Sequence, residues 1–238
     1  MIEFDDTFIK KLQSIIDIGK LQVPIETEVK KTLKKIKELA KTGWVLPIEE
    51  TSEEHWEFLN NRNDTVKLGD LFRYYFNNDD CKRFNNLTER FLKNKSINKF
   101  KSLYEQALFL FKNKSYSGSL VILSVIYEGL IRNLIQYNDN TDVSSNVSKS
   151  LNDKYINKIT ISFQDREAIK IFTENFFQKT DFNNVNASNY FNRNILLHGI
   201  DYTYVTDLDV IKLFNAIDVL VSLIADYDSL LKELSVND

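Results

Sequence analysis

The chain has 238 residues, enough for one large domain or two modest ones with a buried core. Its 31 Lys+Arg and 34 Asp+Glu residues give a net charge of -3. This balance excludes a broad electrostatic attraction to nucleic acid or to an anionic membrane, so any RNA contact needs a local site. The single cysteine, Cys81, excludes an internal disulfide and suits a reducing cytosol, where we expect the protein.

The first part of the chain, residues 1–95, predicts a helical domain whose role the sequence does not reveal. Helical spacing of apolar residues favours helices over 26–43, 53–61, 65–76 and 81–94. Thr51 and Glu54 form the pattern of a capping box, and the Asn/Asp run at 77–80 predicts a turn between two of the helices. LQVPI (21–25) and GWVLPI (43–48) are the only stretches that suggest short extended pieces.

Longer and more apolar helices are predicted from residue 96 to residue 238. Their ranges are 97–116, 117–137, 164–180, 187–199 and 206–234, with a polar loop at 138–155. The most apolar stretch, SLVILSVIYEGLIRNLI, contains Glu128 and Arg132 and falls short of the roughly 20 apolar residues of a membrane span. We therefore predict an all-α protein, with a C-terminal antiparallel helical bundle and no membrane-spanning segment.

The stretch FNRNILLHGI, residues 191–200, holds the best candidates for a functional site. At about 100° per residue, Asn194 and His198 lie only about 40° apart on a helix, and the long side chain of Arg193 flanks the same face. Gly199 predicts the helix end, where the dipole favours a protonated imidazole that can serve as acid or base. A purely structural helix ending that contains this histidine remains an alternative.

RNILLHG resembles the Arg, polar residue, spacer, His motif of the HEPN superfamily (higher eukaryotes and prokaryotes nucleotide-binding), with four residues between Arg193 and His198. YSGSLVILSVIYEGLIRNLI is similar to the family's second helix, and HGIDYTYVTDLDVIKLFNAIDVL to the segment that leads into its last helix. The resemblance covers roughly residues 100–230 and implies an HEPN-like bundle over 96–238. Many relatives carry His where Asn194 stands, although Asn is also common there.

The resemblance implies metal-independent RNA cleavage at a homodimeric site, and we expect a toxin or an abortive-infection effector against phage. His198 would act as acid or base, Arg193 would bind the phosphate and Asn194 would orient it. RNA is the implied substrate, the second subunit would supply the second histidine, and an antitoxin or regulatory protein is a further expected partner. No spacing typical of metal ligands occurs in the sequence, so we expect neither metal nor cofactor.

The sequence allows more than one role for Glu128, suggests a surface role for His55, and leaves two other functions open. Glu128, in the middle of an apolar helix, is either an i,i+4 partner of Arg132 or the residue that orients Arg193. His55 lies among acidic residues, and we expect it to have a surface role. The alternatives to a nuclease are a non-catalytic HEPN module that binds a nucleotide or a protein, and a helical scaffold.

Overall fold

The computed structural model describes residues 22–134, 163–178, 192 and 205–236. These residues are 84% helical, contain no strand, and confirm the predicted all-α class. The chain divides into two units, Met1–Lys35 and Ile36–Asp238. The boundary that the sequence predicts between residues 95 and 96 falls inside the second unit. The separate roles predicted for 1–95 and 96–238 stay a prediction.

The described helices follow one another in the predicted order, while the loop predicted at 138–155 and most of the helix predicted at 187–199 lie outside the described residues. They are α2 (Gln22–Lys41), α3 (Ser52–Asn60), α4 (Thr65–Lys93), the 3-10 helix η2 (Lys95–Phe100), α5 (Lys101–Lys112), α6 (Tyr116–Leu134), α8 (Phe163–Phe176) and α10 (Asp207–Val236). The prediction of an extended piece at 21–25 is wrong from Gln22 onward, where α2 begins. Pro24 lies in the first turn of this helix, where a backbone N–H has no helical partner, so the missing N–H of proline costs little. Residues 44–47 are neither helix nor strand.

Local signals in the sequence account for the start of α3 and the break in α4. The Thr51 hydroxyl accepts from the Glu54 N–H at 3.3 Å, and the Glu54 carboxylate accepts from the Thr51 N–H at 2.8 Å, which confirms the capping box. In α4 the backbone is non-helical over Asn78–Cys81. The predicted turn is therefore present as a kink within one long helix.

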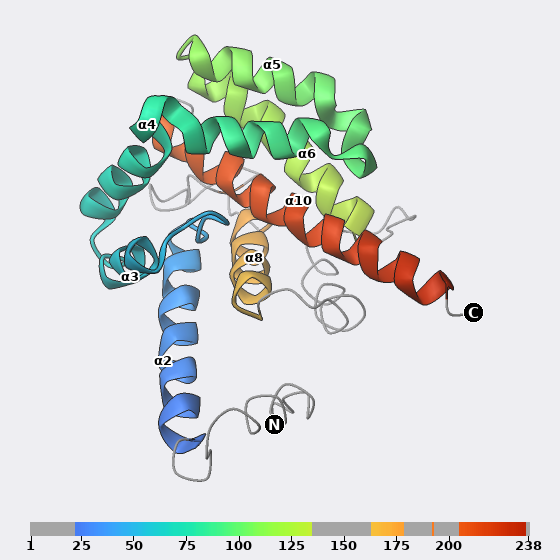
Figure 1. Ribbon diagram of the computed structural model, residues 1–238. Helices are drawn as coiled ribbons and strands as arrows, with labels where there is room; N and C mark the ends of the chain where they lie inside the picture. The colour runs from blue at the N-terminus through green and yellow to red at the C-terminus, as the bar shows by residue number, and fades with distance from the viewer. Residues whose placement is uncertain (1–21, 135–162, 179–191, 193–204, 237–238) are drawn as a thin grey trace. The chain divides into compact units, whose positions relative to one another are not determined.

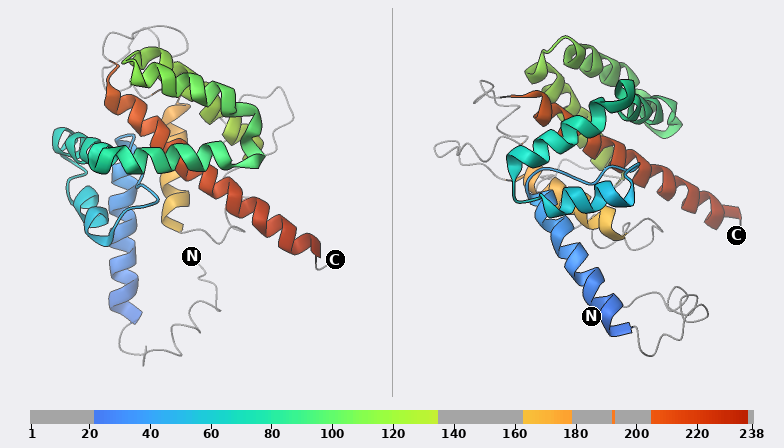
Figure 2. Two further views of the ribbon diagram at one scale, coloured as in Figure 1. Left: turned by 45° about the horizontal axis from the view of Figure 1, so that its top comes forward. Right: turned by 60° about the vertical axis from the view of Figure 1, so that its left-hand side comes forward.

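Within the second unit, α10 is the central element of the hydrophobic core. It contacts α4, α6 and α8, while α5 and α6 pair as a hairpin (Figures 1 and 2). Phe214 of α10 meets Phe84 of α4 and both Tyr104 and Phe111 of α5 at ring centroid distances of 5.2 to 5.6 Å. Such aromatic contacts bury large apolar areas and favour one arrangement of the helices.

Buried polar groups of α10 bind partners far away in the sequence. Arg90 of α4 donates from Nε and Nη2 to the two carboxylate oxygens of Asp218, at 2.9 and 2.6 Å, and it also pairs with Glu49. Asn215 donates to the Val45 carbonyl at 2.7 Å. Nearer the start of α10, the hydrogen bonds from Arg73 lower the pKa of Asp207. These contacts hold α4 and residues 44–49 against α10.

We expect Gly129→Ala to destabilise the protein, because α6 and η2 approach closely at this glycine. A Cβ at residue 129 would lie 2.5 Å from the nearest atom of the Phe100 ring, and that ring is only 9% exposed. Overpacking of this kind costs about 1 to 3 kcal/mol. Thermal unfolding should show it as a fall in Tm of about 2 to 4 °C for each kcal/mol.

Gly118→Ala in the same helix is the matched control. A Cβ at residue 118 would lie 3.2 Å from a methyl group of Leu110, which can move more easily than a buried ring. Alanine also favours a helix by up to about 1 kcal/mol over glycine. Equal Tm values for the two variants would contradict the steric argument.

Candidate functional site

The three residues predicted to form the catalytic site, Arg193, Asn194 and His198, lie outside the described residues. The described neighbour of Arg193 is Asn192, which is 4% exposed. Its Nδ2 donates to the carbonyl oxygen of Gln178, two residues beyond the end of α8, at 2.6 Å. The chain is thus anchored to the end of α8 at the residue before Arg193.

Glu128 lies on α6 with its side chain 12% exposed. Arg132 donates to Oε1 of Glu128 from Nε at 3.1 Å and from Nη2 at 2.9 Å. The i,i+4 pair that the sequence allowed is therefore present, and it satisfies part of the hydrogen-bonding capacity of this carboxylate. The role of Glu128 in orienting Arg193 stays a prediction.

α6 packs on the last turns of α8, which end two residues before Gln178, the partner of Asn192. Tyr127, next to Glu128 in sequence, hydrogen-bonds through its hydroxyl to Thr173 at 2.7 Å and packs edge-on against Phe172 and Phe176. Burial raises the pKa of the Tyr127 hydroxyl, and the bond to Thr173 acts against this shift. This tyrosine is therefore a neutral packing residue that fixes α6 against α8.

A second cluster of titratable groups lines a cavity elsewhere in the second unit. His55 of α3 and Glu50 are hydrogen-bonded, with Nδ1 and Oε1 2.5 Å apart, and their side chains are only 19% and 14% exposed. The surface role expected for His55 does not describe this partly buried position. Glu50 and His55 are five residues apart and lie on either side of the start of α3, whereas side chains that pair along a helix are three or four residues apart. Their pairing could therefore not be predicted from helical spacing.

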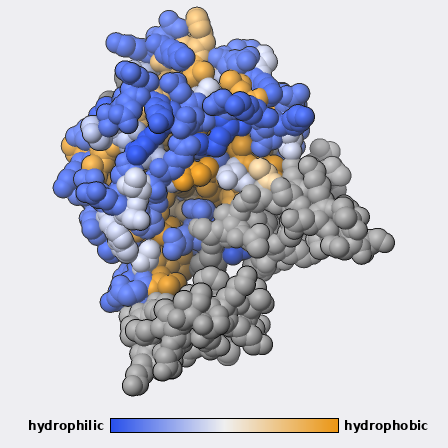
Figure 3. Space-filling model, in the orientation of Figure 1, coloured by the Kyte–Doolittle hydropathy of each residue, from blue (hydrophilic) through white to orange (hydrophobic). Residues whose placement is uncertain are grey.

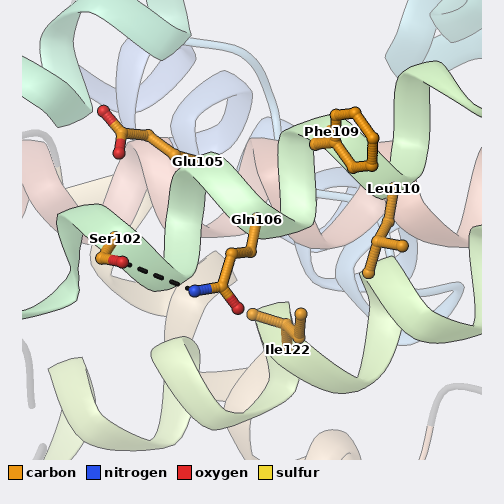
Figure 4. A pocket seen from close by; sticks show the side chains of 6 residues that line it. All are labelled: Ser102, Glu105, Gln106, Phe109, Leu110 and Ile122. Atoms are coloured by element: carbon orange, nitrogen blue, oxygen red, sulfur yellow. Dashed lines mark hydrogen bonds between the residues drawn. The ribbon is translucent and has the colours of Figure 1, made fainter.

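The exposed faces of the described residues offer little else that could bind a ligand. On the face drawn in Figure 3 they are mostly hydrophilic, with small apolar patches. One depression between α5 and α6 is lined by Ser102, Glu105, Gln106, Phe109, Leu110 and Ile122. Figure 4 shows Gln106 and Leu110 directed toward Ile122 and Phe109 pointing away, 65% exposed. The residues that line this depression include no set of groups that could catalyse a reaction.

The described residues contain neither a cluster of metal ligands nor a helix that could span a membrane. Within 22–134, 163–178, 192 and 205–236, no three His, Cys, Asp or Glu residues are grouped so that they could hold a metal ion. None of the helices described there is both long and apolar enough to cross a bilayer. The expectation that the protein needs neither metal nor cofactor stays a prediction.

No family model, no curated protein and no solved structure matches the chain. The candidate site therefore rests on this chain's own residues and on the resemblance of its RNILLHG stretch to the HEPN motif.

Proposed function

We propose that the protein is a metal-independent endoribonuclease of HEPN type that acts in the cytoplasm as a toxin or abortive-infection effector. The observation that carries this proposal is the sequence RNILLHG at 193–199, placed between two apolar helical stretches that resemble the family. One short chain segment supplies a cation that can bind phosphate, an imidazole that can act as acid or base, and an amide that can orient them.

In the proposed reaction a base removes the proton from a ribose 2′-hydroxyl, and the 2′-oxygen attacks the adjacent phosphorus. The bond from phosphorus to the 5′-oxygen breaks, and an acid gives that oxygen a proton. The products are a 2′,3′-cyclic phosphate and a 5′-hydroxyl. Arg193 binds two phosphate oxygens and offsets the charge that builds there, while Asn194 orients the phosphate or the imidazole.

The reaction needs an acid and a base, and each chain offers one histidine in the motif. We therefore propose a homodimer whose two-fold axis brings both copies of His198 to one cleft. His198 of one subunit would act as base and that of the other as acid. An antitoxin or regulatory protein would then control the activity by covering this cleft or by separating the subunits.

Two features of the described structure support this proposal. Asn192 anchors the chain to the end of α8 directly before Arg193, and α6, which carries Glu128, packs on the same helix through Tyr127. An anchor at the residue before Arg193 suits a catalytic motif, because acid-base catalysis depends on precise placement of its groups. The helical bundle that the resemblance implies also agrees with the all-α class.

The proposal is tested by incubating the purified full chain with total cellular RNA, with and without a chelator. Because Arg193 and His198 supply the charge and the proton transfer, we expect cleavage to persist in chelator and to leave 2′,3′-cyclic phosphate ends. DNA of the same sequences should stay intact because it lacks the 2′-hydroxyl. Light scattering should give the mass of a dimer, and cleavage that stops in chelator would contradict the mechanism.

A further inference from the structure

Phe109 of α5 presents an aromatic ring to solvent on the outer side of the α5–α6 hairpin. Phe109 is 65% exposed, and it lies beside Gln106 and Leu110, which line the depression between the two helices. A single exposed apolar residue is common on a protein surface, so the ring alone does not indicate a partner. The charges on either side of Phe109 in the sequence give it a meaning.

Two exposed residues of opposite charge, Glu105 and Lys112, flank Phe109 on the same side of α5. At 100° per residue, Glu105 lies about 40° and Lys112 about 60° from Phe109, in the same sense around the helix. Figure 4 shows the side chains of Glu105 and Phe109 directed to the side of α5 that faces away from Ile122. The face formed by Glu105, Phe109 and Lys112 is called the α5 face below.

Glu105 and Lys112 cannot satisfy each other within one chain. They are seven residues apart, which is about 10 Å along a helix and too far for a direct ion pair. Neither residue forms an ion pair with any other residue that the structure describes. Both charges of the α5 face are therefore available to a second molecule.

A second copy of the chain can pair both charges at once. In a twofold contact the same surface of each copy meets the other, so a residue that contacts a second residue is contacted by it in return. When two α5 helices lie antiparallel about an axis level with the midpoint of Glu105 and Lys112, each Glu105 faces the Lys112 of the other copy. That midpoint falls between Leu108 and Phe109, so the two Phe109 rings meet at the axis.

We propose that the α5 face is the interface of a twofold homodimer. The two Phe109 rings pack against each other at the centre, and an ion pair between Glu105 and Lys112 at each end fixes the register. α5 has 12 residues and is about 18 Å long, so the contact is small and its Kd should be on the order of 10 µM. This inference rests on the proposed function for the role of the dimer, but not for its formation.

Sedimentation equilibrium of the full chain over roughly 1 to 200 µM tests the proposal. We expect the wild type to pass from monomer to dimer across this range. Phe109→Ser should weaken the association by at least about 10-fold, because it removes the central apolar contact from both copies. A wild type that stays monomeric throughout, or a Phe109→Ser protein that dimerises as the wild type does, would overturn the proposal.

Reversal of the two charges tests the twofold geometry itself. Glu105→Lys and Lys112→Glu should each weaken self-association by roughly 10-fold, since each brings two pairs of like charges together. A mixture of the two variants should form heterodimers with about the wild-type affinity, because one chain is then positive and the other negative at both positions. A mixture that associates no better than either variant alone would overturn the proposal.

Glu57→Lys, an exposed substitution on α3 with the same change of charge, is the control and should dimerise as the wild type does. Weakening by Glu57→Lys as large as that by Glu105→Lys would show an effect of net charge and would overturn the proposal. Circular dichroism checks that each variant is folded. The mixture keeps the test decisive, because recovery of the dimer requires that both variants are folded.

Molecular mass and RNA cleavage, measured on the same samples, separate this proposal from the proposed nuclease activity. The His198→Ala protein should dimerise as the wild type does, whatever its activity on RNA. A dimer that depends on Phe109 but cleaves no RNA would contradict the proposed function and support this interface. RNA cleavage by a dimer that Phe109→Ser leaves intact would support the proposed function and overturn this interface.

Discussion

RNA cleavage should fall by about 100- to 10,000-fold when His198 is replaced by alanine, the usual effect of losing a general acid or base. In the proposed dimer the substitution removes the base from one subunit and the acid from the other. The rate should be measured on a defined RNA under single-turnover conditions, where product release does not limit it. Light scattering of each variant confirms that the dimer is intact.

Substitutions at the other motif residues should lower the rate of RNA cleavage by amounts that depend on the role of each side chain. Arg193→Ala should be nearly as weak as His198→Ala, whereas Arg193→Lys should recover only part of the rate, since an ammonium group cannot make the two-pronged contact with a phosphate. Asn194→Ala should lose less than either alanine variant. Lys67→Ala, which removes an exposed cation from α4, is the control for charge and should keep the wild-type rate.

Two outcomes would contradict the nuclease proposal. One is cleavage at the wild-type rate by the His198→Ala protein, which would assign the activity to another site or to a contaminant. The other is failure of the wild-type dimer to cleave any cellular RNA. The second result would favour the non-catalytic HEPN module or the helical scaffold, the two alternatives that the sequence left open.

Asp218→Ala should lower the free energy of unfolding by about 3 to 5 kcal/mol, the usual cost of removing one partner of a buried ion pair. The Asp218 side chain is 3% exposed and accepts two hydrogen bonds from Arg90. Without it, the guanidinium keeps its charge in a partly buried position, and α4 keeps only the Arg73–Asp207 pair as an ionic contact with α10 among the described residues. Urea denaturation followed by circular dichroism measures the loss.

The second partner of the same guanidinium provides the control. Glu49 also pairs with Arg90, but its side chain is 36% exposed, so water can replace it. Glu49→Ala should therefore cost less than about 1 kcal/mol, as surface pairs usually do. Equal losses for Asp218→Ala and Glu49→Ala would show that burial does not determine the strength of this pair.

The sequence by itself determined the fold class and most helix positions. Apolar spacing, the Thr51 capping box and the turn at 77–80 act between residues a few positions apart, so they can be read without knowledge of the fold. The error at 21–25 has a local cause as well, since Pro24 is compatible with the first turn of a helix. RNILLHG also comes from the sequence alone, and its catalytic role stays a prediction.

Only the tertiary structure revealed which distant residues meet. Arg90 and Asp218 are separated by 128 positions, and the Phe100 ring that limits residue 129 lies on a different helix. The Glu50–His55 pair acquires its cavity from α8 and α10, more than a hundred residues later in the chain. Such contacts depend on how helices pack, and the period of a helix specifies which face is apolar but not which other helix will cover it.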